Sequence, residues 1–254
     1  MYIDTHVHLN SNNLYIRLND VINAAFNNNV KKFIVVGYNL ETSKKAIELS
    51  EKYECCYAAI GFHPTEIKGY GDDEYAWLEK ASSHPKVVAI GEVGYDFHWD
   101  TTTKEEQTES FKRQIKIAIK HNLPLIIHSR DAMQLTYDTL KQENAQKVGG
   151  VIHSYSGSSE MAKEFIKIDF RLGISGPVTF KNGKTMKDVV SKIDLKYLLT
   201  ETDSPYLAPH PFRGQENEPK NIAIIVEEIA KIKNISVETI EKTMEENVKN
   251  LFGV

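Results

Sequence analysis

The segment Met1-Tyr-Ile-Asp-Thr-His-Val-His8 opens the chain as a short extended run with two histidines two residues apart. Residues i and i+2 of a β-strand point to the same face, so His6 and His8 can converge on one metal ion while Val7 packs behind them. The alternative is a pair of buried, hydrogen-bonded histidines, which ordinary protein cores also contain. The surrounding sequence has to decide between these two interpretations.

Seven similar runs follow the first one, and an amphipathic stretch separates each run from the next. The eight strand-like runs are Ile3–His6, Lys32–Gly37, Tyr57–Gly61, Val87–Glu92, Leu123–His128, Gly149–His153, Phe170–Ile174 and Tyr197–Thr200. A strand that alternates with a helix eight times predicts an α/β protein, a single-domain (β/α)8 TIM barrel over residues 1–254. A doubly wound open sheet is the alternative, but no glycine-rich phosphate loop follows the first run.

Helices are expected wherever apolar residues recur at intervals of three and four. These stretches cover residues 17–28, 42–53, 73–82, 103–122, 131–143, 158–168 and 184–193. Two more, over residues 222–232 and 237–252, follow a proline-rich loop and would complete the outer ring of helices. Ser236 is placed to cap the last of them.

Composition and charge narrow the class of protein. The chain has 41% hydrophobic residues, no apolar run long enough to span a bilayer, and an N-terminus that enters a strand without a signal sequence. We therefore expect a cytoplasmic protein, and nothing implies a membrane or a stable protein partner. Because 31 Lys+Arg against 35 Asp+Glu give a net charge of −4, a DNA substrate would depend on local basic residues and on metal.

Residues that can bind metals lie at or just after the C-terminal ends of the predicted strands. These residues are His6, His8, His63, Glu92, His128, His153 and Asp203. In a barrel these ends share one rim, where active sites lie, so side chains far apart in sequence would meet in one pocket. The other histidines fall at the opposite rim, at a helix end or in loops, and are interpreted as structural or surface residues: His84, His98, His121 and His210.

Four imidazoles and two carboxylates exceed the three protein ligands that one catalytic zinc usually takes, so the pattern favours two divalent ions. Two such ions can share a hydroxide and promote hydrolysis at phosphorus, with Asp203 as the proton acceptor. A turn or capping role before Ser204-Pro205 is the alternative for Asp203. The simplest partition places one ion on His6, His8 and Asp203, the other on His128 and His153, and makes Glu92 the bridge.

Seven segments, in order along the chain, carry a family resemblance. They are Ile3-Asp-Thr-His-Val-His8, Gly61-Phe-His-Pro64, Ile90-Gly-Glu-Val-Gly-Tyr-Asp96, Ile127-His-Ser-Arg-Asp131, Ile152-His-Ser-Tyr-Ser-Gly157, Glu201-Thr-Asp-Ser-Pro-Tyr-Leu207 and Asn217-Glu-Pro219. Through them the chain resembles the TatD family of metal-dependent deoxyribonucleases, within the amidohydrolase-like barrels. Each motif alone is weak, but the ordered set is highly specific.

The resemblance implies hydrolysis of DNA phosphodiester bonds, with exonuclease action described for some members, and metal ligands at the six positions of the partition. Family activity is associated with magnesium or manganese, while imidazole ligands suit zinc or manganese, so Mg, Mn and Zn are all candidates for the two ions. The chain departs from the commonest pattern at Ser154-Tyr155, where Cys-Phe is usual, and at Gln215-Glu216, which replaces a more basic pair. We expect the first to change packing and the second to weaken a phosphate contact.

Three further residues are candidates for binding substrate: His63, Arg130 and Arg213. Arg130 can offer a bidentate fork to a phosphate, although an ion pair with Asp131 is an equally good alternative. His63 can contact phosphate or support the ligands, while a structural turn is its alternative. Arg213 is weaker, because most charged loop side chains are simply solvated. Aromatic residues could stack bases in the cleft or pack in the core: Tyr95, Phe97, Trp99 and Tyr206.

Two other functions compete with a DNase. A related barrel hydrolase could use the same metal pair to cleave an amide, a lactone or a small phosphoester. Many such relatives bridge their metals with a carboxylated lysine, whereas Glu92 ends the fourth predicted strand here, which favours the DNase-like branch. A non-catalytic scaffold would be expected to lose ligands, and the ligand set is complete.

Overall fold

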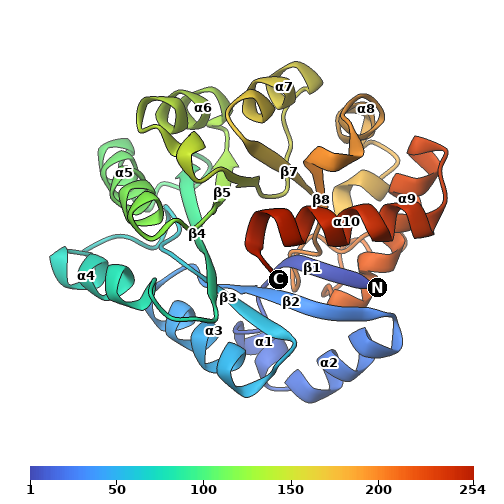
Figure 1. Cartoon of the computed structure of the whole chain (residues 1–254), viewed down its shortest axis with the longest axis horizontal. Helices are drawn as coiled ribbons and strands as arrows, with labels where there is room; N and C mark the ends of the chain where they lie inside the picture. The colour runs from blue at the N-terminus through green and yellow to red at the C-terminus, as the bar shows by residue number, and fades with distance from the viewer.

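The fold rests on one sheet of eight parallel strands, arranged in chain order, in a computed structural model that describes residues 1–254. Only a single bridge, between Val7 and Ser204, joins the last strand region to the first, so the barrel is nearly closed. This arrangement confirms the predicted single-domain (β/α)8 barrel (Figure 1). The strands are β1 (Tyr2–Val7), β2 (Val30–Val36), β3 (Cys56–Ile60), β4 (Val87–Asp96), β5 (Leu125–Arg130), β6 (Gly150–Ile152), β7 (Phe170–Ile174) and β8 (Leu198–Thr200).

Most helices form a ring outside the strands, but α10 lies across one end of the barrel and does not complete that ring, contrary to the prediction for residues 237–252 (Figure 1). Their bounds are α1 (Asn12–Tyr15), α2 (Leu18–Asn27), α3 (Leu40–Lys52), α4 (Asp72–Ala81), α5 (Lys104–His121), α6 (Met133–Gln142), α7 (Ser159–Lys167), α8 (Lys184–Lys192), α9 (Ile222–Lys233) and α10 (Val237–Phe252). The short α1 was not expected. Helix α6 begins two residues later than predicted because Asp131 has a φ of 56°, which a right-handed helix does not accommodate. None of these helices combines the length and the hydropathy that crossing a bilayer requires.

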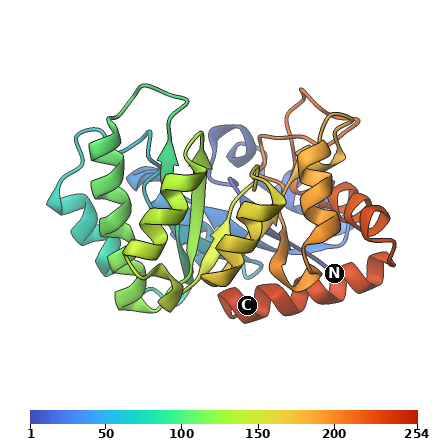
Figure 2. The same cartoon turned by 90° about the horizontal axis from the view of Figure 1, so that it is seen from above.

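The core has two layers because alternate residues of each strand face opposite sides. Phe33 and Val35 of β2 belong to the large cluster that the outer helices cover, whereas Ile34 belongs to a smaller cluster inside the barrel. Val248 and Phe252 of α10 complete that inner cluster. Helix α10 therefore closes the N-terminal end of the barrel, below the strands in Figure 2. Ser236 caps this helix as predicted, accepting a hydrogen bond from the N–H of Thr239 at 3.2 Å.

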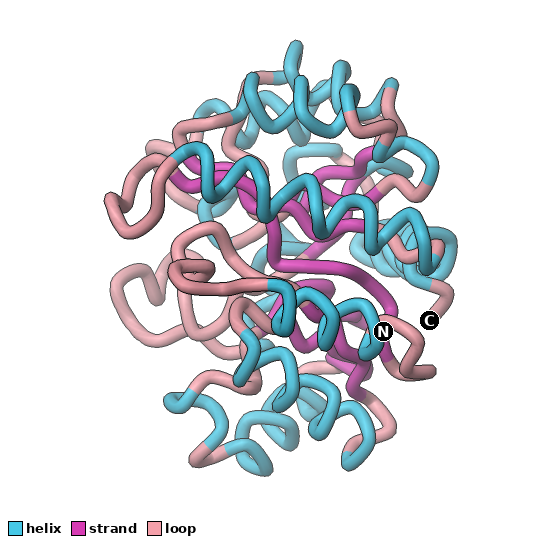
Figure 3. Tube along the Cα trace, turned by 90° about the vertical axis from the view of Figure 1, so that its left-hand side faces the viewer, coloured by secondary structure: helices cyan, strands magenta, loops and turns pink.

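The C-terminal ends of the strands open onto loops. Figure 2 shows these loops above the barrel, opposite α10, and Figure 3 shows them gathered on the side away from both termini. Most of the long connections lie at this rim, including the segment between β8 and α9. The rim therefore has the room and the loop length that a site needs.

Candidate metal centre

The predicted ligands lie at the C-terminal rim, in or just after five of the eight strands. His6 lies in β1 and His8 just after it, His128 lies in β5, and His153 and Asp203 follow β6 and β8. Glu92 differs from the prediction, because β4 continues to Asp96 and Glu92 lies inside the strand. The pairing of β4 with β5 slips in register between Ile90 and Val93, so the strand is irregular where it presents Glu92.

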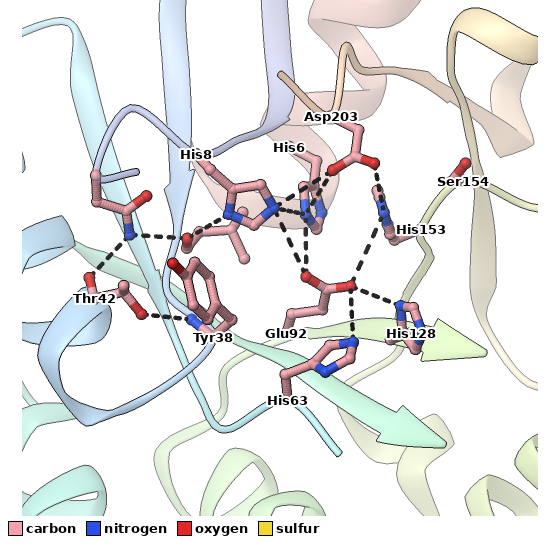
Figure 4. Close-up of polar contacts among 12 residues, drawn as sticks. His6, His8, Tyr38, Thr42, His63, Glu92, His128, His153, Ser154 and Asp203 are labelled. Atoms are coloured by element: carbon pink, nitrogen blue, oxygen red, sulfur yellow. Dashed lines mark hydrogen bonds and ion pairs between the residues drawn. The ribbon is translucent and has the colours of Figure 1, made fainter. Parts of the chain in front are cut away.

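Glu92 lies between two groups of imidazoles, as Figure 4 shows. Its Oε2 atom is 3.5 Å from Nε2 of His6 and 3.9 Å from Nε2 of His8. Its Oε1 atom is 2.8 Å from Nδ1 of His128 and 4.0 Å from Nε2 of His153. One carboxylate thus presents a different oxygen to each group, which is the geometry that a bridge between two cations needs.

The carboxylate of Asp203 completes the first group and also reaches the second. Its Oδ1 atom is 3.4 Å from Nε2 of His8 and 3.8 Å from Nε2 of His6, and Oδ2 is 3.7 Å from Nε2 of His153. Asp203 has a φ of 57°, a left-handed conformation that is uncommon outside glycine and often marks functional sites. Its side chain caps no backbone N–H group, which removes the capping alternative, while its carbonyl oxygen accepts the N–H of Tyr206 at 2.7 Å and so begins a turn.

The tautomer of His8 follows from its surroundings. Its Nδ1 atom lies 3.0 Å from the carbonyl oxygen of Val36, and because a carbonyl only accepts, Nδ1 carries the proton in the neutral ring. The lone pair on Nε2 then faces Nε2 of His6 at 3.3 Å. Nδ1 of His6 is buried without a hydrogen-bond partner. Two ring nitrogens this close, with carboxylate oxygens beside them, fit a cation better than they fit each other.

Electrostatics keep the two carboxylates ionised. Burial raises the pKa of Glu92, but His128 and His6 outweigh burial and hold this pKa well below its usual range. Burial likewise raises the pKa of Asp203, and His153 and His8 bring it below its usual value. Both side chains are therefore charged at neutral pH, as metal ligands have to be.

His63 also faces the centre, but as a hydrogen-bond donor. Its Nδ1 atom accepts the N–H of Thr65 at 3.2 Å, so the proton of the neutral ring is on Nε2, which lies 3.9 Å from Oε1 of Glu92. Burial, together with the neighbouring His128, lowers the pKa of His63 to about 3, and the ring is neutral at pH 7. His63 also forms, with Glu92 and His128, a group whose atoms are close enough to hold a metal ion. A neutral N–H on Nε2 favours contact with a substrate oxygen instead.

Two acidic residues that the sequence analysis left without a role hold the ligand imidazoles. Oδ2 of Asp96 is 2.9 Å from Nε2 of His128, and Oε1 of Glu201 is 2.8 Å from Nδ1 of His153, although poorly aligned for a hydrogen bond. A side chain at Gly173 would bring a Cβ within 2.3 Å of Glu201, so only glycine leaves room for this carboxylate. Asp96 and Glu201 both lie in the segments that carry the family resemblance. Their positions near strand ends do not show whether each carboxylate would bind a metal ion or orient a histidine that does.

The centre lies where two cavities meet. The first arm, of about 450 Å³, lies towards Tyr38, Thr65 and Trp99, and the second arm, of about 640 Å³, lies over β6, β7 and the start of α8. Both arms are lined by His128, Arg130, His153, Asp203 and Tyr206. The cleft is thus continuous across the candidate metal-binding residues.

The predicted substrate residues fall at different places around this cleft. Arg130 lines both arms, and no carboxylate lies within 4.0 Å of it, which removes the ion pair with Asp131 as an alternative. Arg213 lines neither arm; its guanidinium lies 4.4 Å from the centroid of the Phe180 ring. Its phosphate contact therefore stays a prediction.

The four aromatic residues considered for the cleft occupy different positions. Trp99 lines the first arm and Tyr206 lines both, and each is more than half exposed. Phe97 lines neither arm. Tyr95 is fully buried, with its hydroxyl bonded to Thr139, because β4 extends to Asp96 and carries Tyr95 on its outer face. A cleft position for Tyr95 is therefore wrong.

The remaining histidines lie outside the cluster. His84 pairs with Glu51 at 3.1 Å, His98 lies 3.9 Å from Asp131, and His121 contacts Ser83. His210 is exposed in the loop after β8. None of the three groups of side chains that could hold a metal ion includes any of them.

Comparison with known proteins agrees with this geometry. Residues 3–253 match the family model described as TatD related DNase. The chain is 45% identical to the uncharacterized metal-dependent hydrolase YabD of Bacillus subtilis, with both chains covered completely, and 33% identical to the uncharacterized metal-dependent hydrolase YcfH of Escherichia coli, over 99% of this chain and 96% of YcfH. The crystal structure of YjjV, a TatD homolog from E. coli, superposes with a TM-score of 0.95 at 30% identity, covering 100% of this chain and 98% of YjjV. With its barrel, its two imidazole groups and this match over nearly every residue, the chain belongs to the TatD-related DNase family.

Proposed function

We propose that this metal-dependent hydrolase of the TatD family cleaves phosphodiester bonds in DNA with two divalent ions. The observation that carries the proposal is the position of Glu92, whose two carboxylate oxygens face two separate groups of imidazoles. His6, His8 and Asp203 form one group whose ligand atoms lie close enough to hold an ion. His128 and His153 would hold the other ion, and Glu92, whose Oε1 faces both of these rings, would bridge the two ions. Mg, Mn and Zn remain the candidates, and the cytoplasm remains the expected location.

The ions would supply Lewis acidity towards the phosphoester and lower the pKa of water. The chain supplies the rest. Asp203, ionised and at the mouth of the centre, would accept the proton of the attacking water. Arg130, free of any carboxylate partner, would hold a phosphate oxygen pair, and the Nε2–H of His63 would donate to a third oxygen.

DNA is the proposed substrate because three features support a phosphodiester. The family model is that of TatD-related DNases, the unpaired cation of the cleft lies beside the metal-binding residues, and exposed Trp99 and Tyr206 offer faces on which bases can stack. The net charge of −4 gives no general attraction to nucleic acid, so affinity would come from these local contacts.

The test uses protein stripped of metal by a chelator, then supplied with Mg, Mn or Zn in turn. End-labelled DNA, RNA, a small phosphodiester, an amide and a lactone serve as substrates. We expect at least one ion to restore cleavage of DNA, and gel analysis of the products shows whether the bond cut is terminal or internal. Metal-restored cleavage of the amide or lactone alone would replace this proposal with the related-hydrolase alternative.

A further inference from the structure

A cavity of about 520 Å³ lies at the N-terminal end of the barrel, the end that α10 closes in Figure 2. The segments that enter β6, β7 and β8 form its wall together with the C-terminal half of α10, through residues such as Val148, Asp169, Tyr197 and Asn250. None of its lining residues lines either arm of the cleft. The cavity is therefore separate from the candidate metal centre.

Arg171 lines this cavity from the inner face of the sheet. Its neighbours in β7, Phe170 and Leu172, belong to the large cluster that the outer helices cover, so Arg171 faces the interior of the barrel. It pairs in register with Val151 of β6, which belongs to the inner apolar cluster. Burial at this position lowers the pKa of Arg171, so these surroundings oppose its positive charge.

The guanidinium of Arg171 has few partners within the protein. Its Nη1 donates to the carbonyl oxygen of Asn247 at 2.6 Å, and the side chain forms no other hydrogen bond. No carboxylate oxygen lies within 4.0 Å of it, and Asp169, the one acid that lines the cavity, acts on its charge only from farther away. Because a guanidinium carries five N–H donors in a planar fork, most of the fork stays open to a ligand.

Two lysines add positive charge to the same cavity. Lys147 has no carboxylate within 4.0 Å, and the carboxylate nearest to Lys196, that of Asp194, lies 3.9 Å from it. With Arg171, these lysines give the lining three cations against one carboxylate, although the whole chain has a net charge of −4. A local excess of two positive charges favours a small dianion.

The size and the remaining lining describe that dianion further. The volume of about 520 Å³ lies within the usual range of small-molecule sites, so an organic group can enter together with the charge. Apolar side chains line part of the wall, and they belong to Val148, Ile166, Phe170, Tyr197 and Leu251. A phosphate monoester satisfies both kinds of lining, because its terminal oxygens match a guanidinium fork and its organic group can cover apolar surface.

We propose that this cavity binds a small phosphate monoester, with the phosphate held by Arg171, Lys147 and Lys196 and the organic group against Tyr197 and Leu251. The site is independent of the proposed function, because none of its residues takes part in hydrolysis at the metal centre. Its occupant would contact α10 and the entries to three strands at once, so binding would stabilise the folded barrel.

The first experiment uses phenylphosphonate, a dianion with an aromatic ring whose carbon–phosphorus bond resists hydrolysis. It is titrated by calorimetry into the metal-loaded wild type and its variants. We expect Arg171→Gln and Lys147→Gln each to weaken binding at least about 10-fold. Lys31→Gln is the matched control and should bind normally, since Lys31 is exposed like Lys147 and lies at the same end of the barrel, outside the cavity.

Because Arg171 also holds Asn247, circular dichroism checks the fold of Arg171→Gln, while Lys147→Gln changes only an exposed side chain and is a test by itself. No binding by the wild type, or equal binding by the wild type and Lys147→Gln, overturns the proposal. So does binding that Arg130→Ala abolishes and Lys147→Gln retains, because the ligand would then lie in the cleft.

The second experiment tests the kind of anion with three further probes. Benzenesulfonate has the same ring but one charge, inorganic phosphate has the charge but no ring, and succinate carries two carboxylates. We expect each to bind at least about 10-fold more weakly than phenylphosphonate, and only phenylphosphonate to raise the Tm of the wild type more than that of Lys147→Gln. Equally tight binding of inorganic phosphate or succinate would refute a phosphate monoester as the occupant.

Discussion

The two ends of the barrel are made by the same eight strands but are closed in different ways. At the N-terminal end, Val248 and Phe252 of α10 pack on Ile3 and Leu199, and the closure is mainly apolar, with the buried Asn247 side chain donating to the carbonyl oxygens of Leu195 and Leu198. At the C-terminal end, imidazoles and carboxylates fill the equivalent space, and His6 is fully buried there with an unpartnered ring nitrogen. Burying apolar surface stabilises the fold, whereas burying charged or unpartnered groups costs free energy unless a ligand satisfies them.

The difference shows how one scaffold separates stability from chemistry. The N-terminal end can be optimised for packing because it binds nothing in the proposed function. The C-terminal end buries ring nitrogens and carboxylates that would need cations as partners. Binding of metal would therefore offset the free energy that burying these groups costs. Changes at the two ends should therefore affect different measurements, which the following variants test.

Glu92→Gln is expected to have the largest effect. Glutamine keeps the shape of the side chain but removes the charge, so neither ion would find its shared ligand. We expect hydrolysis to fall about 1000-fold and metal content to fall with it, while circular dichroism shows an unchanged fold. Glu66→Gln, in the first arm but hydrogen-bonded to Asn39 instead, is the matched control and should keep activity. Full activity in Glu92→Gln would refute the two-metal arrangement.

Phe252→Ala tests the opposite end. Phe252 is buried against the inner cluster, and its loss leaves a cavity that should lower the free energy of unfolding by about 3 kcal/mol in urea titrations. Activity per folded molecule and metal content should not change. Lys249→Ala, exposed on the same helix, should leave stability within about 0.5 kcal/mol of the wild type. A loss of metal from Phe252→Ala would show that the two ends are not independent.

The fold and the rim position of the candidate ligands could be predicted because both follow from periodicity. Strand-like runs return eight times, and the metal-binding residues fall near the ends of these runs, which a barrel brings to one rim. The inward position of Glu92 was harder to predict, because Glu92 lies at a register slip inside β4 and not at the end of that strand. For Tyr95 the sequence left cleft and core positions open, and the core position is the one observed, because β4 is longer than its apolar run indicates.

Relations between neighbouring side chains could not be predicted, because sequence spacing does not give their direction. Arg130 and Asp131 are adjacent, yet Asp131 has a φ of 56° and its carboxylate lies near His98 instead. Asp96 contacts the imidazole of His128, which is 32 residues away in sequence. Glu201 contacts the imidazole of His153, which is 48 residues away. Such contacts depend on the register between strands, which no local pattern specifies.

Arg130→Ala tests whether the unpaired cation at the C-terminal end serves substrate rather than metal. Removing the guanidinium should lower kcat/KM on DNA about 10- to 100-fold and leave metal content unchanged, because Arg130 contacts the cleft and not the ions. Arg130→Lys should recover only part of the activity, since lysine lacks the planar fork. Arg213→Ala, outside both arms, should have a much smaller effect. Equal losses in Arg130→Ala and Arg213→Ala would argue against a specific phosphate contact at Arg130.

Asp96→Asn should have the smallest effect of the four variants. It tests whether a carboxylate that contacts a candidate ligand contributes to metal affinity. Oδ2 of Asp96 lies 2.9 Å from Nε2 of His128, and Oε1 of Glu92 lies 2.8 Å from Nδ1, so a metal ion at Nδ1 requires the ring proton to stay on Nε2 beside Asp96. An asparagine amide can donate to Nε2 instead, which would place the proton on Nδ1 and block a metal ion. We therefore expect metal affinity to fall about 10-fold, measured by titration with a competing chelator, with the fold unchanged. Asp131→Asn, which removes an exposed carboxylate on the same rim, is the control and should bind metal normally. Unchanged affinity in Asp96→Asn would mean that strand geometry alone orients His128.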